Sequence, residues 1–552
     1  MRRGQVTGIV LAAGLVLLLG LWHLTDVRAG VVASGDRWLY GYYIWLLLFG
    51  MVFLAMSGYQ MCAGRQWSLE RFFVWAALGL GIMFCIVLPP LSAPDEASHY
   101  ISAYQLSNRL LGREACTEDS QVYIRPQDCL IEDMTDILKD DGSGYREGRG
   151  DEGTVILGQE LTEETYRWIY RERLEEDREN TWQTEEGAAA LQAEQCLSYQ
   201  PTVRTTPMAY VPQAVGITIS RLLGLGPVGL LFFGRLMNLF FFTAMGYLAI
   251  RRMPFGKEIL FGVYMLPMTL HLASSFSYDV MILACSGYFA AICLDLAYRA
   301  ERVRAADVLL LALLMGVMGP CKMVYGVITG YCLLIPIKKF GGIRNWVISA
   351  VLVLGAFCGA MIAVNRNTVA MYAEASESYV AWAQETGYTF SQLIHSPLLV
   401  IKMCYNTLMW QGEQLYSGMI GSALGNMDPV LNTPYVVVLA LTAILAVLAL
   451  KKPGENVWMG ALSRAWIWFL SLTCLSALMF SMLLAWTPVT ASMIQGVQGR
   501  YLLPLLPMIL LTVKNDRVVR TGWNDGYLLY VMTALDVYVI LRIFAVVCLR
   551  VS

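Results

Sequence analysis

"FFVWAALGLGIMFCIVLPPLSAPDEASHY", residues 72–100, joins a long apolar run to a short polar turn. Residues 72–90 carry no charge, and as a helix they are long enough to cross about 30 Å of hydrocarbon. Prolines at 89, 90 and 94 then stop the helix, and Asp95, Glu96 and His99 follow directly. The stretch predicts a transmembrane helix that ends at the edge of the bilayer, with ionisable groups at its rim.

Apolar runs of similar length recur along the whole chain. It has 552 residues, of which 57% are hydrophobic and only 15% charged, and its mean hydropathy is +0.53. These values predict an all-α polytopic membrane protein with about 12–14 transmembrane helices. The candidate spans are 6–24, 39–61, 72–90, 229–250, 257–275, 279–298, 306–319, 321–337, 343–364, 433–450, 464–486, 500–513 and 526–549.

The net charge of −2 hides one strongly acidic segment. Residues 91–206 hold 25 of the 42 acidic residues and 11 of the 40 basic ones, which leaves 17 acidic and 29 basic residues elsewhere. This balance excludes a nucleic-acid partner, which would require a basic stripe.

Basic residues fall in alternate gaps between the spans, and the positive-inside rule therefore predicts that these gaps are cytoplasmic. The prediction gives a multi-pass protein of the cell (plasma) membrane with a cytoplasmic N-terminus. It makes 91–206 one large, partly helical extracytoplasmic loop, on the same side as 275–279, 319–322, 365–432 and 495–501. Counting 207–225 as a crossing would break the alternation, so we expect that segment to be re-entrant or interfacial. The residues used are Arg2, Arg3, Arg65, Arg71, Arg251, Arg252, Lys257, Arg299, Arg302, Arg304, Lys338, Lys339, Arg344, Lys451, Lys452, Lys514, Arg517 and Arg520.

The N-terminal run 6–24 resembles a signal peptide, but it lacks an A-x-A-like cleavage site and further spans follow it, so we expect a retained helix. In the acidic loop, 162–182 has helical spacing of aromatic and charged residues, and 139–154 is typical of a turn or linker. An extracytoplasmic loop would permit a Cys116–Cys129 disulfide and leave Cys196 unpaired.

Asp95, Glu96 and His99 allow two interpretations. An acidic pair after a span is often only a solvated loop, and a single histidine is often a hydrogen-bonded interface residue. Within five residues, however, this set can hold a divalent cation such as Mg or Mn, or can supply a general base.

Asp279 and Lys322 stand at the predicted outer ends of apolar runs. A carboxylate at a helix start can be a simple cap that complements the helix dipole. Lys322, in "MGPCKMVYGV", either reaches the lipid head groups or faces an aqueous cavity, where we expect an anion as its partner.

Arg500 lies in "MIQGVQGRYLLPLLP", where two glycines let the backbone turn closely. It begins a span on the predicted outer side, against the positive-inside trend, and a guanidinium there suits bidentate recognition of phosphate. Tyr501 would occupy the ordinary position of a tyrosine at the head-group level.

Together, these residues place a carboxylate pair and two unusual cations on one side of the membrane. A site that transfers a group from a lipid phosphate needs this combination, because a carboxylate takes the proton of an incoming hydroxyl and the cations hold the leaving phosphate.

Five stretches resemble, in order, an uncharacterised bacterial membrane family known as domain of unknown function 2142, over roughly residues 75–515. They are "PPLSAPDEASHY", "TPMAYVPQAVGITISRLLG", "FFGRLMNLFFFTAMGYLAIRRMPFGKEILFGVYMLPMTLHLASSFSYD", "KMVYGVITGYCLLIP" and "IQGVQGRYLLPLLP". That family is similar to the GT-C superfamily of membrane glycosyltransferases. The resemblance implies a GT-C-like membrane domain at 72–515, preceded by a helix pair at 1–71 and followed by a helix at 516–552.

The resemblance also implies roles for single residues. Asp95 matches the aspartate of the family's "PDE" and Glu96 its neighbour, which makes them the candidate catalytic pair. His99 matches the histidine that follows, and Arg500, with Gln498 and Tyr501, matches "QGRY". The usual "PDEP" is "PDEA" here, and two additional spans, 6–24 and 39–61, precede the span before the acidic motif, where GT-C enzymes commonly have one span.

The function predicted from these residues is transfer of a sugar from a polyprenyl-phosphate donor to a surface polysaccharide or glycolipid acceptor on the outer leaflet. Arg500 and Lys322, with His99, Gln498, Tyr501 and Asp279, would bind the donor. The main alternative is a transporter or lipid-linked glycan flippase, which predicts ionisable residues at mid-membrane depth. A scaffold for a polysaccharide assembly complex is a third interpretation.

Overall fold

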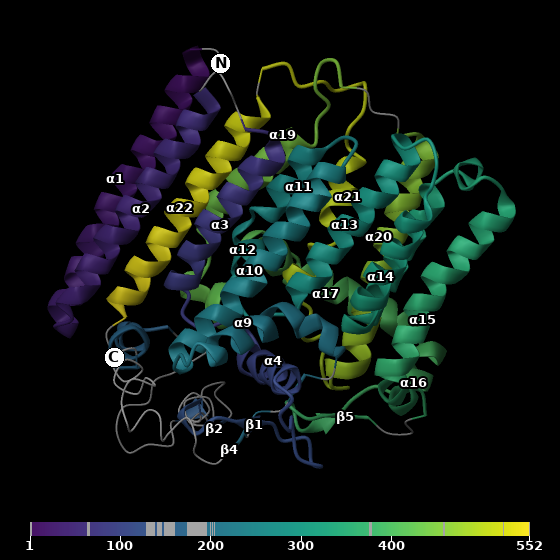
Figure 1. Ribbon diagram of the computed structural model, residues 1–552, viewed down its shortest axis with the longest axis horizontal. Helices are drawn as coiled ribbons and strands as arrows, with labels where there is room; N and C mark the ends of the chain where they lie inside the picture. Colours follow the sequence, from purple (N-terminus) through teal and green to yellow (C-terminus); the bar gives the residue numbers. More distant parts are fainter. Residues whose placement is uncertain are drawn as a thin grey trace.

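The structure is a computed structural model of the chain. It describes residues 3–62, 67–128, 139–140, 146–147, 161–173, 196–198, 200, 202–203, 205–374, 378–455, 459–522 and 524–550. Figure 1 shows a bundle of helices with short strands at one end only.

Within these residues, eight helices are long and apolar enough to cross a membrane. They confirm the prediction of an all-α polytopic membrane protein. They are α1 (Arg3–Ser34), α2 (Arg37–Cys62), α3 (Leu69–Val87), α10 (Pro227–Arg252), α13 (Asp279–Tyr298), α15 (Ile343–Glu374), α20 (Ala461–Trp486) and α22 (Asp525–Leu549).

The other predicted spans are shorter or broken. Three are short apolar helices, namely α14 (Ala305–Cys321), the 3₁₀ helix η4 (Met323–Leu334) and α19 (Tyr435–Leu448). The span expected at 257–275 is divided into α11 (Lys257–Tyr264) and α12 (Pro267–Ala273), because Pro267 cannot continue a helix from α11. The Thr269 hydroxyl donates to the Val263 carbonyl at 2.9 Å, so it satisfies a backbone oxygen at the break.

The predicted gaps rich in basic residues meet at one end of the bundle, which we call the basic end. There Arg252 pairs with Asp295 of α13 and with Asp307 of α14. The buried Lys514 ammonium lies 2.8 Å from the Glu258 carboxylate at the start of α11. These contacts bring the predicted basic gaps around Arg252 and Lys514 to the same end of the bundle.

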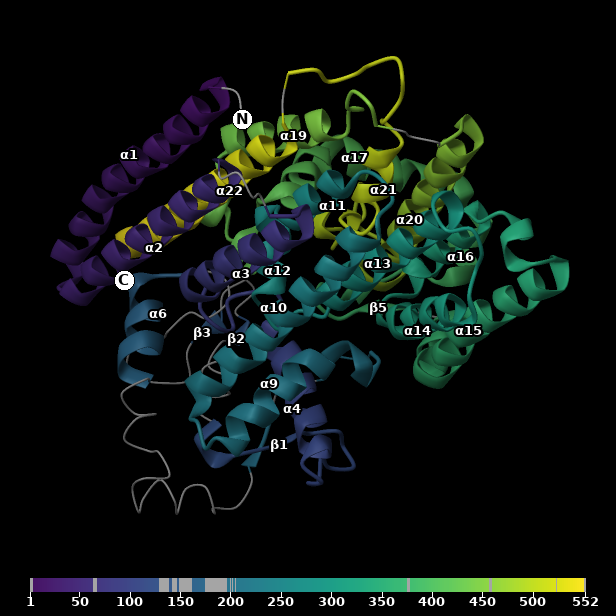
Figure 2. The same ribbon diagram turned by 45° about the horizontal axis from the view of Figure 1, so that its top comes forward.

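The helices α1, α2 and α22 form a layer at one edge of the bundle, and both views show them side by side (Figure 1, Figure 2). Gly30 of α1 makes the close approach possible, because a Cβ there would lie 2.0 Å from the Cys548 carbonyl oxygen of α22. Small residues at such crossings let helix backbones pack closely in membranes.

The described part of the acidic segment packs at the end of the bundle opposite the basic end. It is partly helical, as predicted, and Tyr166 donates to the Val87 carbonyl where α3 ends. Its elements are α4 (Glu96–Leu110), β1 (Tyr123–Ile124), η1 (Pro126–Asp128), β2 (Lys139–Asp140), β3 (Arg146–Glu147), α6 (Glu163–Arg167), the π-helical turn η2 (Trp168–Arg173) and β4 (Cys196–Leu197). Strands β1 and β4 pair antiparallel, as do β2 and β3. Cys129 of the predicted disulfide, most of the predicted linker and residues 174–182 of the predicted helix lie outside the described residues.

The segment 207–225 forms a short helix rather than a crossing. After η3 (Pro207–Tyr210), α9 (Val211–Leu222) has 12 residues, which is about 18 Å at 1.5 Å per residue and too short for the hydrocarbon core. It packs against α4 and α10, and its length agrees with the prediction that this segment does not cross the membrane.

The segment 365–432 contains a long helix that the sequence did not predict. Residues 365–374 continue α15, and α17 (Pro397–Ile420) packs against the turn before the last two helices. The remaining elements are η5 (Ile337–Phe340), β5 (Tyr379–Val380), β6 (Glu385–Thr386), α16 (Phe390–His395), α18 (Leu424–Met427), η6 (Pro429–Leu431), η7 (Gly499–Leu502) and α21 (Leu506–Leu511).

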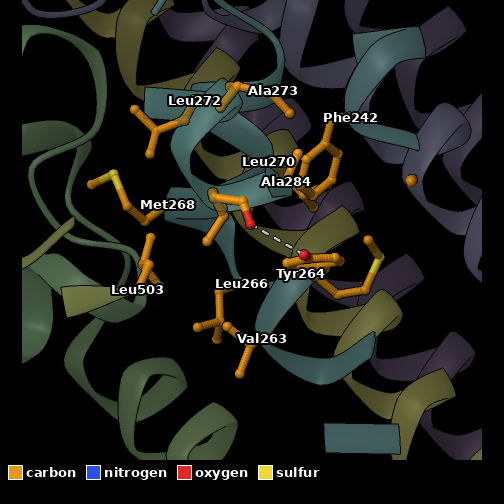
Figure 3. Packing of buried hydrophobic residues seen from close by; sticks show 14 of the residues in the cluster. Phe242, Val263, Tyr264, Leu266, Met268, Leu270, Leu272, Ala273, Ala284 and Leu503 are labelled. Atoms are coloured by element: carbon orange, nitrogen blue, oxygen red, sulfur yellow. Dashed lines mark hydrogen bonds between the residues drawn. The ribbon is translucent and has the colours of Figure 1, made fainter. Parts of the chain in front are cut away.

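The core is centred on the broken pair α11 and α12. Figure 3 shows Tyr264, Leu266 and Leu270 packed among side chains of α10, α13 and the segment after η7. Because the residues of both short helices after Lys257 are buried, the ends of the break are held by packing on every side. This core fixes the loop that follows α12.

Candidate functional site

The helix α3 ends at the proline-rich turn, as the sequence predicts, and this turn contains two residues with positive φ angles. Leu88 ends the helix, Pro89, Pro90 and Pro94 follow, and Leu91 and Asp95 have positive φ angles of 66° and 56°. Positive φ is unusual for residues other than glycine, although aspartate adopts it more readily than most. The turn starts α4 with Asp95 as the residue immediately before the helix.

Asp95 and Glu96 point to different environments. Asp95 is exposed, and in the described part of the protein its carboxylate has no hydrogen bond. Glu96 is 1% exposed, and its oxygens accept from the backbone N–H groups of Ala93 at 3.0 Å and Phe276 at 2.9 Å. Its partner in charge is Arg235 of α10, whose Nε lies 3.4 Å from Glu96 Oε1 in a pair with no exposed side-chain surface. Only Asp95 is free to meet a substrate.

The loop 274–278, between α12 and α13, is held from several directions. Phe276 donates to Glu96, Asn238 donates to the Ser275 carbonyl at 2.7 Å, and Gln213 donates to the Phe276 carbonyl at 3.2 Å. The Ser277 hydroxyl accepts from the N–H of Asp279 at 3.2 Å. These contacts fix where α13 begins, and Asp279 is its first residue.

Asp279 joins the two cations that the sequence singled out. Lys322 Nζ donates to Asp279 Oδ1 at 2.7 Å, and Arg500 Nε lies 3.3 Å from Asp279 Oδ2. The expected anionic partner of Lys322 is thus a carboxylate of the same chain. Two cations on one carboxylate leave a local excess of positive charge.

Aromatic rings cover the two cations. Lys322 Nζ lies 3.8 Å from the centre of the Tyr501 ring and 5.4 Å from that of Tyr278, and Arg500 Cζ lies 5.5 Å from the Tyr501 ring. The Tyr325 hydroxyl donates to the Tyr501 carbonyl at 2.7 Å. Tyr501 therefore contributes to the site and does more than mark the membrane interface.

His99 lies beside this cluster as a buried, neutral side chain. Its Nδ1 is 2.7 Å from the Tyr210 hydroxyl, and its ring packs edge-on against Tyr278. Burial lowers the pKa of His99 to about 4, although the charges of Asp95 and Asp279 act in the opposite direction. Lys322 and Arg500 also lower the pKa of this imidazole, so all four charged groups act on it electrostatically.

Glycines place Arg500, as the sequence predicted. Gly496 has a φ of 75°, and a Cβ at Gly499 would lie 2.1 Å from the Leu415 carbonyl oxygen of α17. Arg500, Gln498 and Gln414 line one cavity of about 70 Å³. Gln498 is therefore adjacent to the cluster through this small cavity.

Comparison with known families gives a match over most of the chain. The family described as "Predicted membrane protein (DUF2142)" matches residues 78–509. The chain belongs to this family. The matched region omits the whole of α1, α2 and α22, which are the helices of the edge layer. No curated protein and no solved structure matches this DUF2142 chain.

The predicted metal ligands do not form a metal site in the described residues. Both Glu96 oxygens are used by backbone donors, the His99 Nδ1 atom contacts Tyr210, and no group of His, Cys, Asp or Glu side chains converges there. We therefore derive no step through Mg or Mn in this DUF2142 protein.

Sequence reasoning brought together Asp95, His99, Asp279, Lys322, Arg500 and Tyr501, which the fold also gathers at one end of the bundle. It missed the aromatic residues Tyr210, Tyr278 and Tyr325, because tyrosines near span ends are common. It also missed Arg235, although an arginine within the apolar run of α10 is a signal that could have identified a buried ion pair.

Proposed function

We propose that this protein is a membrane glycosyltransferase that moves a sugar from a lipid-phosphate donor to a hydroxyl of a surface polysaccharide or glycolipid. The supporting observation is the exposed Asp95 carboxylate, whose charge acts on His99 and Arg500, together with the pairing of Asp279 with Lys322 and Arg500. A free carboxylate next to fixed cations supplies both a proton acceptor and a binding site for a leaving phosphate.

In the proposed step, Asp95 accepts the proton of the acceptor hydroxyl. The hydroxyl oxygen forms a bond to the anomeric carbon of the sugar, and the bond from that carbon to the phosphate oxygen breaks. The electron pair of the broken bond stays on the phosphate, whose additional charge faces Lys322 and Arg500. The proton remains on Asp95 until water removes it.

The neighbouring residues position this machinery. Asp279 keeps the Lys322 ammonium and the Arg500 guanidinium near each other, which reduces the reorganisation needed when the phosphate becomes more negative. Glu96 is a positioning residue, because it ties the Asp95 turn to the loop that leads to Asp279. His99 is neutral and borders the site, where it forms a hydrogen bond with Tyr210.

The orientation in the membrane belongs to the same proposal. The positive-inside rule places the basic end in the cytoplasm, so the site would face the outer leaflet of the plasma membrane. The donor would then be a polyprenyl phosphate sugar of that leaflet.

The test is a transfer assay with purified protein in liposomes that contain a panel of polyprenyl-phosphate sugars and candidate acceptors. We expect Asp95→Asn to reduce donor consumption by about 10²–10⁴-fold without loss of folding. The control is Glu114→Gln, which makes the same kind of change at an exposed residue of the same acidic segment but leaves the site unperturbed. Full activity of Asp95→Asn would contradict the proposed base.

A second candidate function, transport or lipid flipping, is favoured by one observation. Asp536 is the twelfth residue of the 25-residue α22, it has no exposed surface, and neither carboxylate oxygen has a partner among the described residues. An ionisable residue at such a position often marks a path for ions or substrates. Flux of labelled lipid or protons that is lost in Asp536→Asn, with no sugar transfer by the wild type, would favour this function over the transferase.

A further inference from the structure

A second site of a different chemistry lies towards the basic end of the bundle. Between α14, η4 and α15 there is a cleft with a cavity volume of about 290 Å³, much larger than the 70 Å³ cavity beside Arg500. Its lining is almost entirely apolar and includes Val308, Leu311, Leu333, Phe340, Trp346 and Val353. Apolar cavities of even about 150 Å³ stay dry and bind hydrocarbon ligands.

The cleft opens to the side of the bundle. Leu333 of η4 and Leu354 of α15 line it, yet they are 57% and 49% exposed. The outer face of α15 beside the opening is also apolar, since Val347 and Val351 are exposed. The opening therefore faces the hydrocarbon of the bilayer, and an occupant can enter laterally.

The wall formed by η4 needs support on its cleft side. This element is a 3₁₀ helix of 12 residues, whereas 3₁₀ runs longer than about 3–4 residues are uncommon because their hydrogen bonds have poorer geometry. Gly326 and Gly330, which line the cleft, also lie against Phe357 and Leu470, where a Cβ would meet ring or methyl atoms at 2.4–2.5 Å. Side chains that face an empty cleft lose dispersion contacts that an occupant would restore.

Unpaired cations surround the cleft at the basic end. Arg302, Lys338 and Arg344 are exposed, each lies within two residues of a lining residue, and none forms an ion pair within the described ranges. Lys339 differs, because its ammonium donates to three carbonyls at the end of α13. Basic residues beside an apolar slot between transmembrane helices suit the head group of an anionic lipid.

We propose that this cleft is a binding site for one phospholipid with an anionic head group. One hydrocarbon chain fills the cavity between α14, η4 and α15, and the phosphate contacts Arg302, Lys338 and Arg344. The bound chain supports η4 along the side that protein atoms leave open. The proposal does not depend on the transfer reaction, because the donor phosphate would bind near Lys322, at the other end of η4, about 24 Å away at 2.0 Å per residue.

The first test is native mass spectrometry of the full-length protein purified in detergent, with phosphatidylglycerol and phosphatidylcholine added in turn. We expect the wild type to retain phosphatidylglycerol at least about tenfold better than phosphatidylcholine. Ala350→Trp places a large ring in the cleft and should abolish retention, whereas Val351→Trp, at the next position on the exposed face of α15, should leave it unchanged. Ser349→Leu, a smaller filling of the same cleft, serves as the second variant if Ala350→Trp does not fold.

The head-group contact has its own test. Lys338→Gln combined with Arg344→Gln should remove the preference for phosphatidylglycerol while the cleft still accepts a chain. Equal retention by the wild type and both cleft-filling variants would overturn the proposal. It would also be overturned if the lipid that co-purifies with the protein, and that the filling variants lose, were a polyprenyl phosphate.

Discussion

Replacement of Glu96 by glutamine separates the two members of the acidic pair most clearly. Glu96 and Arg235 have no exposed side-chain surface, and Glu96 Oε1 lies 3.4 Å from Arg235 Nε. Glu96→Gln removes the negative charge and leaves the guanidinium buried without compensation, which typically costs about 3–5 kcal/mol. The glutamine amide also presents a donor to Ala93 or Phe276, whose N–H would then lose its acceptor at a cost of about 1–3 kcal/mol.

Asp95→Asn is the matched control at the adjacent position. Asp95 is exposed and makes no side-chain hydrogen bond in the described structure, and asparagine tolerates its φ of 56°. We therefore expect its free energy of unfolding to stay within about 0.5 kcal/mol of the wild type. The two substitutions have the same chemistry but should differ in stability by several kcal/mol.

The assay is thermal unfolding in detergent, followed by tryptophan fluorescence, together with the rate of inactivation at a fixed temperature. Glu96→Gln should lower the apparent Tm by on the order of 5 °C, and Asp95→Asn should leave it unchanged. Adding Arg235→Met to Glu96→Gln should recover part of the loss, because it removes the uncompensated charge. The reasoning fails if Glu96→Gln and Asp95→Asn unfold at the same temperature.

Three further predictions concern the glycines and the histidine. Gly499→Ala should destabilise the protein by about 1–3 kcal/mol, because the added Cβ would lie 2.1 Å from the backbone of α17. It should also weaken donor binding in the transfer assay. Unchanged donor binding would show that this contact does not position Arg500. Gly30→Ala should destabilise the protein by a similar amount in thermal unfolding, because its Cβ would lie 2.0 Å from a carbonyl oxygen of α22. The control Gly14→Ala, where the Cβ enters open space, should stabilise α1 by up to about 1 kcal/mol. Equal changes in stability for the two variants would refute the close crossing of α1 and α22. The pKa of His99 is lowered to about 4 while an unfolded histidine titrates near 6.5, so the unfolded state binds more protons between these values and stability should fall as the pH is lowered through this window. His99→Gln should flatten that pH dependence, and an unchanged slope would mean that other groups cause it.

The long apolar helices and the end of the bundle that carries the charged cluster could both be predicted from the apolar runs, whereas α17 and the break between α11 and α12 could not. Each of Asp95, Asp279, Lys322 and Arg500 stands at the end of an apolar run, so the topology alone brings them to one end of the bundle. The pairing between them was not predictable, because it depends on the exact rotation of α13 about its axis and on the loop that precedes it.

Other features remained hidden for identifiable physical reasons. Asp95 and Glu96 are neighbours in sequence, but at the start of α4 consecutive side chains diverge, so one is exposed and the other is buried against Arg235. Asp536 is visible in the sequence as a carboxylate within the apolar run of α22, but the sequence does not reveal that its carboxyl group has no partner among the described residues. The broken span at Pro267 was visible as a proline, but packing decides that it becomes two buried helices.

The edge layer of α1, α2 and α22 has a consequence for biosynthesis. Its members are separated by almost the whole chain, from Ser34 at the end of α1 to Asp525 at the start of α22. At about 5–20 residues per second, a ribosome needs roughly 25–100 s to add the intervening residues. During that time lipid must cover the surface around Gly30 that α22 later occupies. The layer is therefore completed last. In a chain whose translation stalls before α22, the helices α1 and α2 would be inserted in the membrane but not anchored to the bundle by α22.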